Sequence, residues 1–279
     1  MTLGVTALVL LAALMHATWN ALIKASRDTS LNTALLAGAA SLLSAPLLAF
    51  VPAPQAASWP YLIASWVVHQ AYFAMVGAAY RHGDLSLTYP LMRGLPPLLV
   101  AGAGAFLLPD AASPWLWTGV VTVSVGVLWI GGFQRMLRHA HGRSTAFAAA
   151  NAVLIAAYTL IDGMGVRLSG NAASYGLWLF FLIAMPYVGI VVSRHRGTIR
   201  AQVRLHWWRA LLGAALSIGA YLIVLWAMTV APVAAVAALR ETSVIFAAAI
   251  GALLLKEPFG RDRVAGACVV VLGIAMLKA

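Results

Sequence analysis

The stretch Val236–Ala279, VAALRETSVIFAAAIGALLLKEPFGRDRVAGACVVVLGIAMLKA, predicts two apolar helices joined by a short charged turn. Arg240 and Glu241 lie inside the first of these helices, where charged side chains are unusual. The same design occurs 147 residues earlier, because a gapless shift by that number places Arg240 on Arg93. The same shift places Gly251 on Gly104, Glu257 on Asp110, Gly266 on Gly119 and Gly273 on Gly126. The chain therefore contains an internal repeat, which bears on its whole architecture.

The composition indicates a membrane protein. Of the 279 residues, 63% are hydrophobic and only 9% are charged, whereas about a quarter of a soluble domain is charged. Apolar stretches of about 18 to 23 residues recur along the whole chain, which is the length needed to cross a bilayer. Residues 1–23 lack a basic region before the apolar run, so they predict a retained helix and not a cleaved signal peptide. The single Cys268 excludes a disulfide framework within the chain.

We expect an all-α integral membrane protein with ten transmembrane helices in two inverted five-helix repeats. The expected spans are residues 3–23, 31–51, 59–80, 86–108, 115–133, 144–163, 172–193, 206–228, 233–255 and 261–278. The repeat pairs the fourth span with the ninth and the fifth with the tenth, which gives halves of residues 1–139 and 140–279. Because five is odd, similar halves must lie in opposite orientations, as in many secondary transporters.

Prolines predict irregular helices in two of these spans. Pro90, Pro96 and Pro97 lie inside the fourth span, and Pro186 lies inside the seventh. A proline in a helix interior removes one backbone hydrogen bond and clashes with the preceding turn. We therefore expect a kink or a local opening in both spans.

Basic residues predict the orientation in the membrane. Most of them follow odd-numbered spans: Lys24, Arg27, Arg81, Arg135, Arg138, Arg143, Arg194, Arg196, Arg200, Arg204, Lys256, Arg261 and Arg263. The opposite side carries only Arg167 and Lys278. Basic loops stay in the cytoplasm, so both termini are expected on the non-cytoplasmic side. This scatter also explains the net charge of +11 without a nucleic-acid partner.

Arg93 and Arg240 are the sharpest functional signal. Each is the eighth residue of its span, roughly 12 Å from the end at which the helix begins. Both are therefore expected near the membrane midplane, where inverted-repeat transporters hold their substrates. Glu241 should point about 100° away from Arg240 on a regular helix, since neighbouring residues do not face each other. We expect Glu241 to meet Arg93 instead, either in a substrate site or in a purely structural clamp.

Other polar and aromatic side chains are candidates for a cavity wall. They are His16, Trp19 and Asn20 of the first span, and Tyr72, Tyr89, Tyr158 and Tyr221, with Glu241 and Asp162 as proton-coupling candidates. For each there is a structural alternative: interhelical bonding in the first span, a cap or interfacial role for Asp162, and the interfacial aromatic belt for the tyrosines. Tyr175 and Trp178 are expected in that belt because they lie near the start of their span.

Glycines spaced by seven predict close helix packing. Gly119 and Gly126 share one face of the fifth span, and Gly266 and Gly273 share one face of the tenth. Small residues let two helix backbones approach closely in a membrane. We expect these faces to pack the fifth span against the tenth, with a homodimer interface as the alternative.

Catalytic patterns are absent from the sequence. The seven acidic residues include no evident acid–base pair, and no nucleophile lies near a base. Metal-ligand spacing and phosphate-binding motifs are also missing. We therefore expect no enzyme activity, no metal and no cofactor.

Two stretches carry a family resemblance. LRETSVIFAAAIGALLLKEPFGRDRVAGACVVVLGIAML, residues 239–277, closes the second half, and YPLMRGLPPLLVAGAGAFLL, residues 89–108, echoes it in the first. With the ten expected spans, they resemble the EamA family of the drug/metabolite transporter superfamily over essentially the whole chain. The related small multidrug transporters keep a proton-coupling glutamate in their first helix. The first span here has no acid, which argues against proton-coupled export of cationic drugs.

The resemblance implies a bacterial inner-membrane carrier, often an exporter of amino acids or other small metabolites. It implies a central cavity lined by the third, fourth, eighth and ninth spans, with contributions from the first and sixth, and turn roles for Asp110 and Glu257. We expect a secondary transporter with a small-molecule solute as its partner in the bilayer. The alternatives are a passive facilitator, or an accessory protein that binds a small molecule or a lipid head group without net transport.

Overall fold

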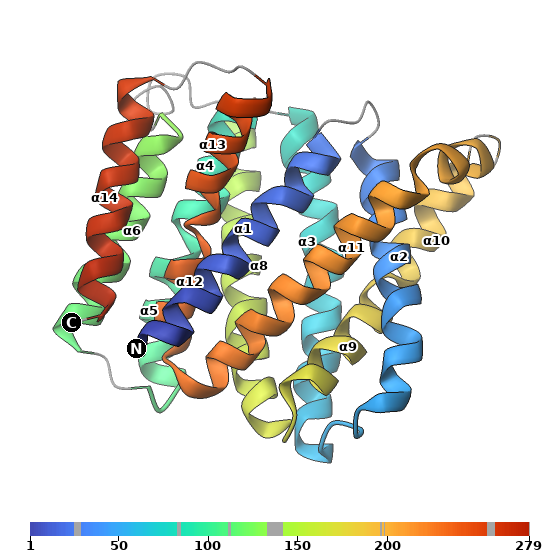
Figure 1. Ribbon diagram of the computed structural model, residues 1–279, viewed down its shortest axis with the longest axis horizontal. Coiled ribbons are helices and arrows are strands. Elements are labelled where there is room, and N and C mark those ends of the chain that lie inside the picture. The colour runs from blue at the N-terminus through green and yellow to red at the C-terminus, as the bar shows by residue number, and fades with distance from the viewer. Residues whose placement is uncertain are drawn as a thin grey trace.

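A computed structural model describes residues 1–24, 29–82, 85–110, 113–132, 142–195, 197, 199–255 and 260–278. These residues form a bundle of helices whose two chain ends lie at the same end of the molecule (Figure 1). The α-helices are α1 (Leu3–Lys24), α2 (Thr29–Leu47), α3 (Trp59–His82), α4 (Leu85–Gly94), α5 (Pro96–Leu107), α6 (Pro114–Ile130), α8 (Gly142–Leu168), α9 (Ala172–Ile183), α10 (Met185–Arg194), α11 (Ile199–Val230), α12 (Val233–Arg240), α13 (Ser243–Leu255) and α14 (Arg261–Lys278). Short 3-10 turns, η1 (Leu48–Phe50) and η2 (Ala56–Ser58), lie between α2 and α3.

Many of the helices can cross a membrane. By length and composition, seven of the described segments qualify as candidate spans: Leu3–Leu22, Leu31–Phe50, Pro90–Leu107, Thr145–Leu168, Ala172–Arg194, Ile199–Val230 and Val233–Leu253. The helix Pro114–Ile130 is apolar but shorter. Helices also occupy the ranges expected for the third and tenth spans, α3 and α14. The all-helical, membrane-spanning class is thereby confirmed in its main feature.

Two of the expected spans are interrupted at proline. α4 ends at Gly94 and α5 begins at Pro96, while α9 ends at Ile183 and α10 has Pro186 within its first two residues. A proline fits at the start of a helix because its missing N–H has no partner there in any case. The predicted irregularities are confirmed at these two places. Pro90, by contrast, lies inside α4 without a break.

A third interruption occurs without proline, between α12 and α13. The Glu241 N–H donates to Ala238 O at 3.1 Å and the Thr242 N–H donates to Leu239 O at 3.1 Å, which is the tighter i to i+3 spacing. The Thr242 hydroxyl also donates to Leu239 O at 2.7 Å. These bonds satisfy the carbonyl groups of the last turn of α12, which have no partner further along the helix. The break falls 147 residues after the one between α4 and α5.

Glycines bring α6 and α14 into backbone contact (Figure 1). A Cβ atom placed on Gly126 would lie 2.8 Å from Val270 N, and one on Gly273 would lie 2.8 Å from Val123 N. The corresponding atoms on Gly119 and Gly266 would meet the side chains of Leu277 and Ile130 at 2.7 Å. Only hydrogen fits at these positions, so the close approach of the two helices depends on the glycines.

Candidate functional site

Both buried arginines lie where a helix stops inside the bundle. Arg93 is next to the last residue of α4, and Arg240 is the last residue of α12. Their exposed fractions are 8% and 5%. The C-terminal end of a helix carries partial negative charge, which favours a cation. The two interruptions therefore create the positions that make these charges tolerable in the membrane interior.

Glu241 joins the two arginines. Its Oε2 lies 3.4 Å from Arg93 Nη1 and its Oε1 lies 3.5 Å from Arg240 Nη2, and the glutamate is fully buried. Contact with Arg93 is as expected. The expectation that Glu241 would not pair with Arg240 is wrong, because the helix ends at Arg240 and the two side chains no longer follow helical spacing. Two guanidinium groups and one carboxylate leave a surplus positive charge in this cluster.

The first helix completes the cluster. The Nε2 atom of His16 contacts Arg93 Nη2, and the His16 ring packs edge-on against Trp19, with ring centroids 5.0 Å apart. Asn20 turns back on its own helix, where its amide donates to His16 O at 2.7 Å. His16 and Asn20, predicted to share one helix face, therefore differ in their contacts. His16 contacts Arg93, whereas Asn20 bonds within α1.

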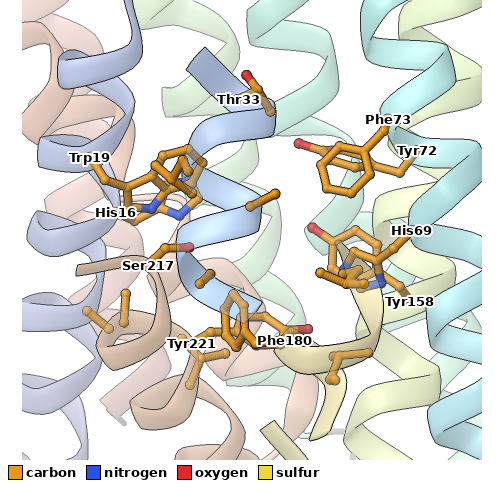
Figure 2. Close-up of a pocket in the computed structure, with 18 of the residues that line it drawn as sticks. His16, Trp19, Thr33, His69, Tyr72, Phe73, Tyr158, Phe180, Ser217 and Tyr221 are labelled. Atoms are coloured by element: carbon orange, nitrogen blue, oxygen red, sulfur yellow. The ribbon is translucent and has the colours of Figure 1, made fainter. Parts of the chain in front are cut away.

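A cavity of about 140 Å³ lies beside this cluster, which is room for about ten water molecules. Its walls come from α1, α2, α3, α8, α9, α11 and α12. The lining residues are Ala12, His16, Trp19, Thr33, Leu36, Ala37, Ala40, His69, Tyr72, Phe73, Tyr158, Leu179, Phe180, Ile183, Ser217, Ala220, Tyr221, Val224 and Arg240. Figure 2 shows their aromatic rings arranged around the open space. The wall is therefore mostly apolar and aromatic, with Arg240 as its cation.

Some of the candidate residues line this cavity and others lie behind its wall. The lining includes Arg240, His16, Trp19, Tyr72, Tyr158 and Tyr221. Arg93, Glu241 and Asp162 do not line it but contact residues that do. Tyr89 belongs to α4, and its side chain lies outside the described part of the structure. Asn20 contacts neither the cavity nor the arginines in the interactions described.

Arg240 keeps an unused hydrogen-bond donor beside the cavity that it lines. Its Nε atom is buried and has no hydrogen-bond partner in the described part of the chain. Its guanidinium carbon lies 5.9 Å from the centre of the Tyr158 ring, a cation–π distance. A buried donor without a partner is expensive.

Tyr158 connects the aromatic residues on the α3 side of the cavity. Its ring stacks on His69 with centroids 4.2 Å apart and meets Tyr72 edge-on at 5.8 Å. Phe73 stacks in turn on Tyr187 at 4.8 Å. The aromatic wall predicted from these tyrosines is thus a set of rings in mutual contact, and His69 is part of it.

Asp162 lies in the interior and not at a helix end. α8 continues to Leu168, beyond the expected end of the span, and the Asp162 carboxylate is fully buried. Tyr175 donates to its Oδ1 at 2.9 Å, and Tyr221 donates to its Oδ2. Tyr175 is itself fully buried, so its expected place in the interfacial belt is wrong. Tyr175 is buried because neighbouring helices cover it. Its position along its own helix does not reveal that burial.

The bundle is tied together at the end that carries the termini. Arg167 pairs with Asp110 at 2.8 Å and also donates to the carbonyls of Met228 and Ala231. Asp110 accepts in addition from the Val233 N–H at 2.9 Å, the first residue of α12. The turn role implied for Asp110 therefore includes an ion pair between the two halves. Glu257, its counterpart, lies outside the described residues.

Two helices contribute to the cavity with the parts that lie farther from the chain termini. Its lining residues in α1, from Ala12 to Trp19, belong to the second half of that helix, and those in α2, from Thr33 to Ala40, to its first part. Both segments point away from the chain termini in Figure 1. Walls from α2 and α9 were not expected from the sequence. The lining residues of these two helices are mostly small or aliphatic. In a membrane protein such residues face lipid as well as cavities, so the sequence alone does not identify them as lining residues.

Helices long and apolar enough to cross a bilayer indicate a multi-pass membrane protein, and comparison with known proteins adds the family. Residues 143–278, the second half of the chain, match the EamA-like transporter family, so this half belongs to it. A search of curated proteins finds no match. One solved structure, titled "Crystal structure of protein", is similar over 99% of this chain and 98% of its own, with 17% identity and a TM-score of 0.73. At that identity, the likeness shows the fold alone.

The family places this chain in the drug/metabolite transporter superfamily. Its members are membrane transporters and generally not enzymes, so a small-molecule solute and a lipid bilayer are the partners it implies.

Proposed function

We propose that the protein is a secondary transporter that exports amino acids or similar small metabolites by alternating access around the central cavity. The observation that carries this proposal is the cavity itself, which places an incompletely bonded Arg240 among aromatic rings inside a membrane bundle. Concave, mostly apolar pockets with a few fixed polar groups are typical of small-molecule sites. The family match supplies the transporter class.

The repeat supports an architecture of ten spans in two inverted halves, residues 1–139 and 140–279. Gly119 meets Leu277, and Ile130 meets Gly266; a shift of 147 residues exchanges these two contacts. The contact of Gly126 with Val270 is related to that of Val123 with Gly273 in the same way. Reciprocal contacts of this kind are expected of two halves related by a twofold axis in the membrane plane.

The proposed solute carries a carboxylate or another anionic group. Arg240 would bind that group in the cavity, with Arg93 supporting it from behind and Glu241 holding both guanidinium groups in place. The rings of Trp19, Tyr72, Tyr158 and Tyr221 would enclose the remainder of the solute, and His16 would adjust the position of Arg93. A surplus charge of one in the cluster favours a solute group of opposite charge.

Alternating access would rock the two halves around this site. The segments of α1 and α2 that line the cavity lie toward the end that carries the basic loops, which the positive-inside rule assigns to the cytoplasm. The pair of Arg167 and Asp110 closes the other end, where both termini would lie outside. This arrangement fits a conformation that accepts solute from the cytoplasm of a bacterium across its inner membrane.

Counterflow in liposomes tests the proposal. Purified protein in vesicles preloaded with an amino-acid mixture should take up labelled amino acids added outside, one at a time. Arg240→Ala should slow uptake about tenfold to a hundredfold, the loss expected for a charged hydrogen bond, and Arg200→Ala, on the exposed surface, should not. If no labelled solute exchanges, the carrier proposal fails. If exchange survives both Arg240→Ala and Arg93→Ala, the charges are structural, as in a passive facilitator.

A further inference from the structure

The bundle holds two deeply buried carboxylates, and their surroundings differ. Glu241 lies between two guanidinium groups, at 3.4 Å from Arg93 and 3.5 Å from Arg240. Asp162 forms no ion pair within the described residues, and its hydrogen-bond partners there are the hydroxyl groups of Tyr175 and Tyr221. An ionisable side chain inside a membrane bundle with only neutral partners is unusual and points to a function.

Helices from three sides converge on Asp162. Tyr175 comes from α9 and Tyr221 from α11, and α3 places Ser65 and His69, one turn apart, near the carboxylate. The other titratable groups nearby are Tyr158, on α8 itself, and Arg240 of α12, beyond the Tyr158 and Tyr221 rings. The His69 Nδ1 atom is occupied by Ser65, whose carbonyl lies at 2.8 Å.

Asp162 reaches the cavity through these partners. Tyr221 and His69 both line the cavity, while the carboxylate lies behind them. In Figure 2, His69 lies beside Tyr158 on one side of the open space, and Tyr221 lies below it near Phe180. Tyr221 and His69 are therefore the polar side chains that separate Asp162 from a proton in cavity water.

We infer that Asp162 is the proton-binding residue of this transporter and that Tyr221 couples its protonation to the cavity. The inference deepens the transport function proposed above and rests on it. Asp162 takes up one proton from cavity water and changes from a carboxylate to a neutral acid. Glu241 bridges the two arginines instead.

The number of hydrogen bonds to Asp162 explains how its protonation affects Tyr221. Each carboxylate oxygen accepts from one tyrosine, Oδ1 from Tyr175 and Oδ2 from Tyr221, but a protonated carboxyl oxygen becomes a donor and accepts poorly. At least one hydroxyl must then turn away or accept. Tyr175 is fully buried between α8 and α9, whereas Tyr221 borders open space, so Tyr221 is the one that is free to move. Its release loosens α11 from α8 and changes the shape of the cavity wall.

Infrared spectroscopy of the reconstituted protein tests the assignment without any knowledge of the solute. Lowering the pH should add the band of a buried, slowly exchanging carboxylic acid. The band should be missing in Asp162→Asn, which keeps the size of the side chain, and present in Asp162→Glu. A wild-type spectrum without such a band, or a band that persists in Asp162→Asn, overturns the inference.

Two further readouts keep the test decisive. Tyr221→Phe removes one partner in an otherwise intact site and should shift the frequency of the acid band; an unshifted band contradicts the coupling through Tyr221. In vesicles, an imposed pH gradient should drive accumulation of labelled amino acid by the wild type and not by Asp162→Asn. If the wild type exchanges no solute at all, transport fails as a function while the band still decides whether Asp162 binds a proton.

Discussion

Glu241 determines whether the charged cluster can be buried at all. It is fully buried and lies within 3.5 Å of Arg93 and of Arg240. An ion pair taken out of water contributes little net stability, but removal of one partner leaves an uncompensated buried charge. The cluster is therefore more sensitive to loss of its single acid than to loss of one of its two arginines.

Glu241→Gln is expected to destabilise the protein by about 3–5 kcal/mol, the range for breaking a buried ion pair. Thermal unfolding in detergent measures the change. The double variant Arg93→Gln and Glu241→Gln removes one cation with its counter-charge and should recover much of the loss. Unfolding of Glu241→Gln at the wild-type temperature would contradict the bridging role.

At the scale of single residues, sequence located the charged cluster but not all of its geometry. Arg93 and Arg240 stood out because the repeat aligned them at equal depth. The contact of Glu241 with Arg240 was missed because nothing in the local sequence marks the end of α12, which has no proline. The shift by 147 residues would have marked it, since the matching position in the first half precedes Pro96.

Glycine contacts dominate the packing of α6 against α14. A methyl group on Gly126 would lie 2.8 Å from Val270 N and 2.9 Å from Gly266 O. A clash with backbone atoms cannot be relieved by rotating a side chain. The helices themselves would have to separate.

Gly126→Ala is therefore expected to cost about 1–3 kcal/mol, as overpacking does in a filled interior. Gly102→Ala in α5 is the matched control, because a Cβ atom there meets nothing within 4 Å. Unfolding by a denaturing detergent compares the two. Equal stability of the two variants would show that α6 and α14 are not in backbone contact.

The end of the bundle near the termini depends on one carboxylate with two roles. Asp110 pairs with Arg167 and accepts from the Val233 N–H. Asp110→Asn keeps an oxygen for the amide but loses the ion pair, whereas Asp110→Ala loses both.

Hydrogen exchange separates these roles. The Val233 amide is expected to exchange faster in Asp110→Ala than in the wild type and to change little in Asp110→Asn. The ion pair is partly exposed and is worth about 1 kcal/mol or less, so Asp110→Asn should fold normally. An amide rate unchanged in Asp110→Ala would contradict the contact.

At the scale of helices, the sequence predicted the segments and their proline breaks well. Each expected span coincides with a helix or with two helices in series, because apolar length and proline position are local properties. The cavity walls from α2 and α9 could not be predicted in this way. Ala37 or Leu179 would look the same in a lipid-facing position, and only packing decides which side a small residue faces.

On the scale of the whole molecule, both chain ends lie at one end of the bundle (Figure 1). Basic residues gather at the other end, among them Arg200, Arg204 and Arg261. Alkaline phosphatase folds only outside the cytoplasm, so a fusion after Ala279 is expected to be active and one inserted at Gly197 inactive. The reverse pattern would invert the proposed orientation while leaving the fold unchanged.

The surplus positive charge beside the cavity has a thermodynamic consequence. Arg240 has a buried donor that lacks a partner in the described part of the chain, and the proposed solute would bring an anionic group to this arginine. Any solute that binds the folded bundle but not the unfolded chain raises the melting temperature, by an amount that grows with the logarithm of its concentration relative to its Kd. A panel of carboxylates, each matched with its uncharged amide, tests this by thermal shift. Each bound carboxylate should raise the melting temperature more than its amide does. The carboxylate with the largest shift identifies the cargo before any flux is measured.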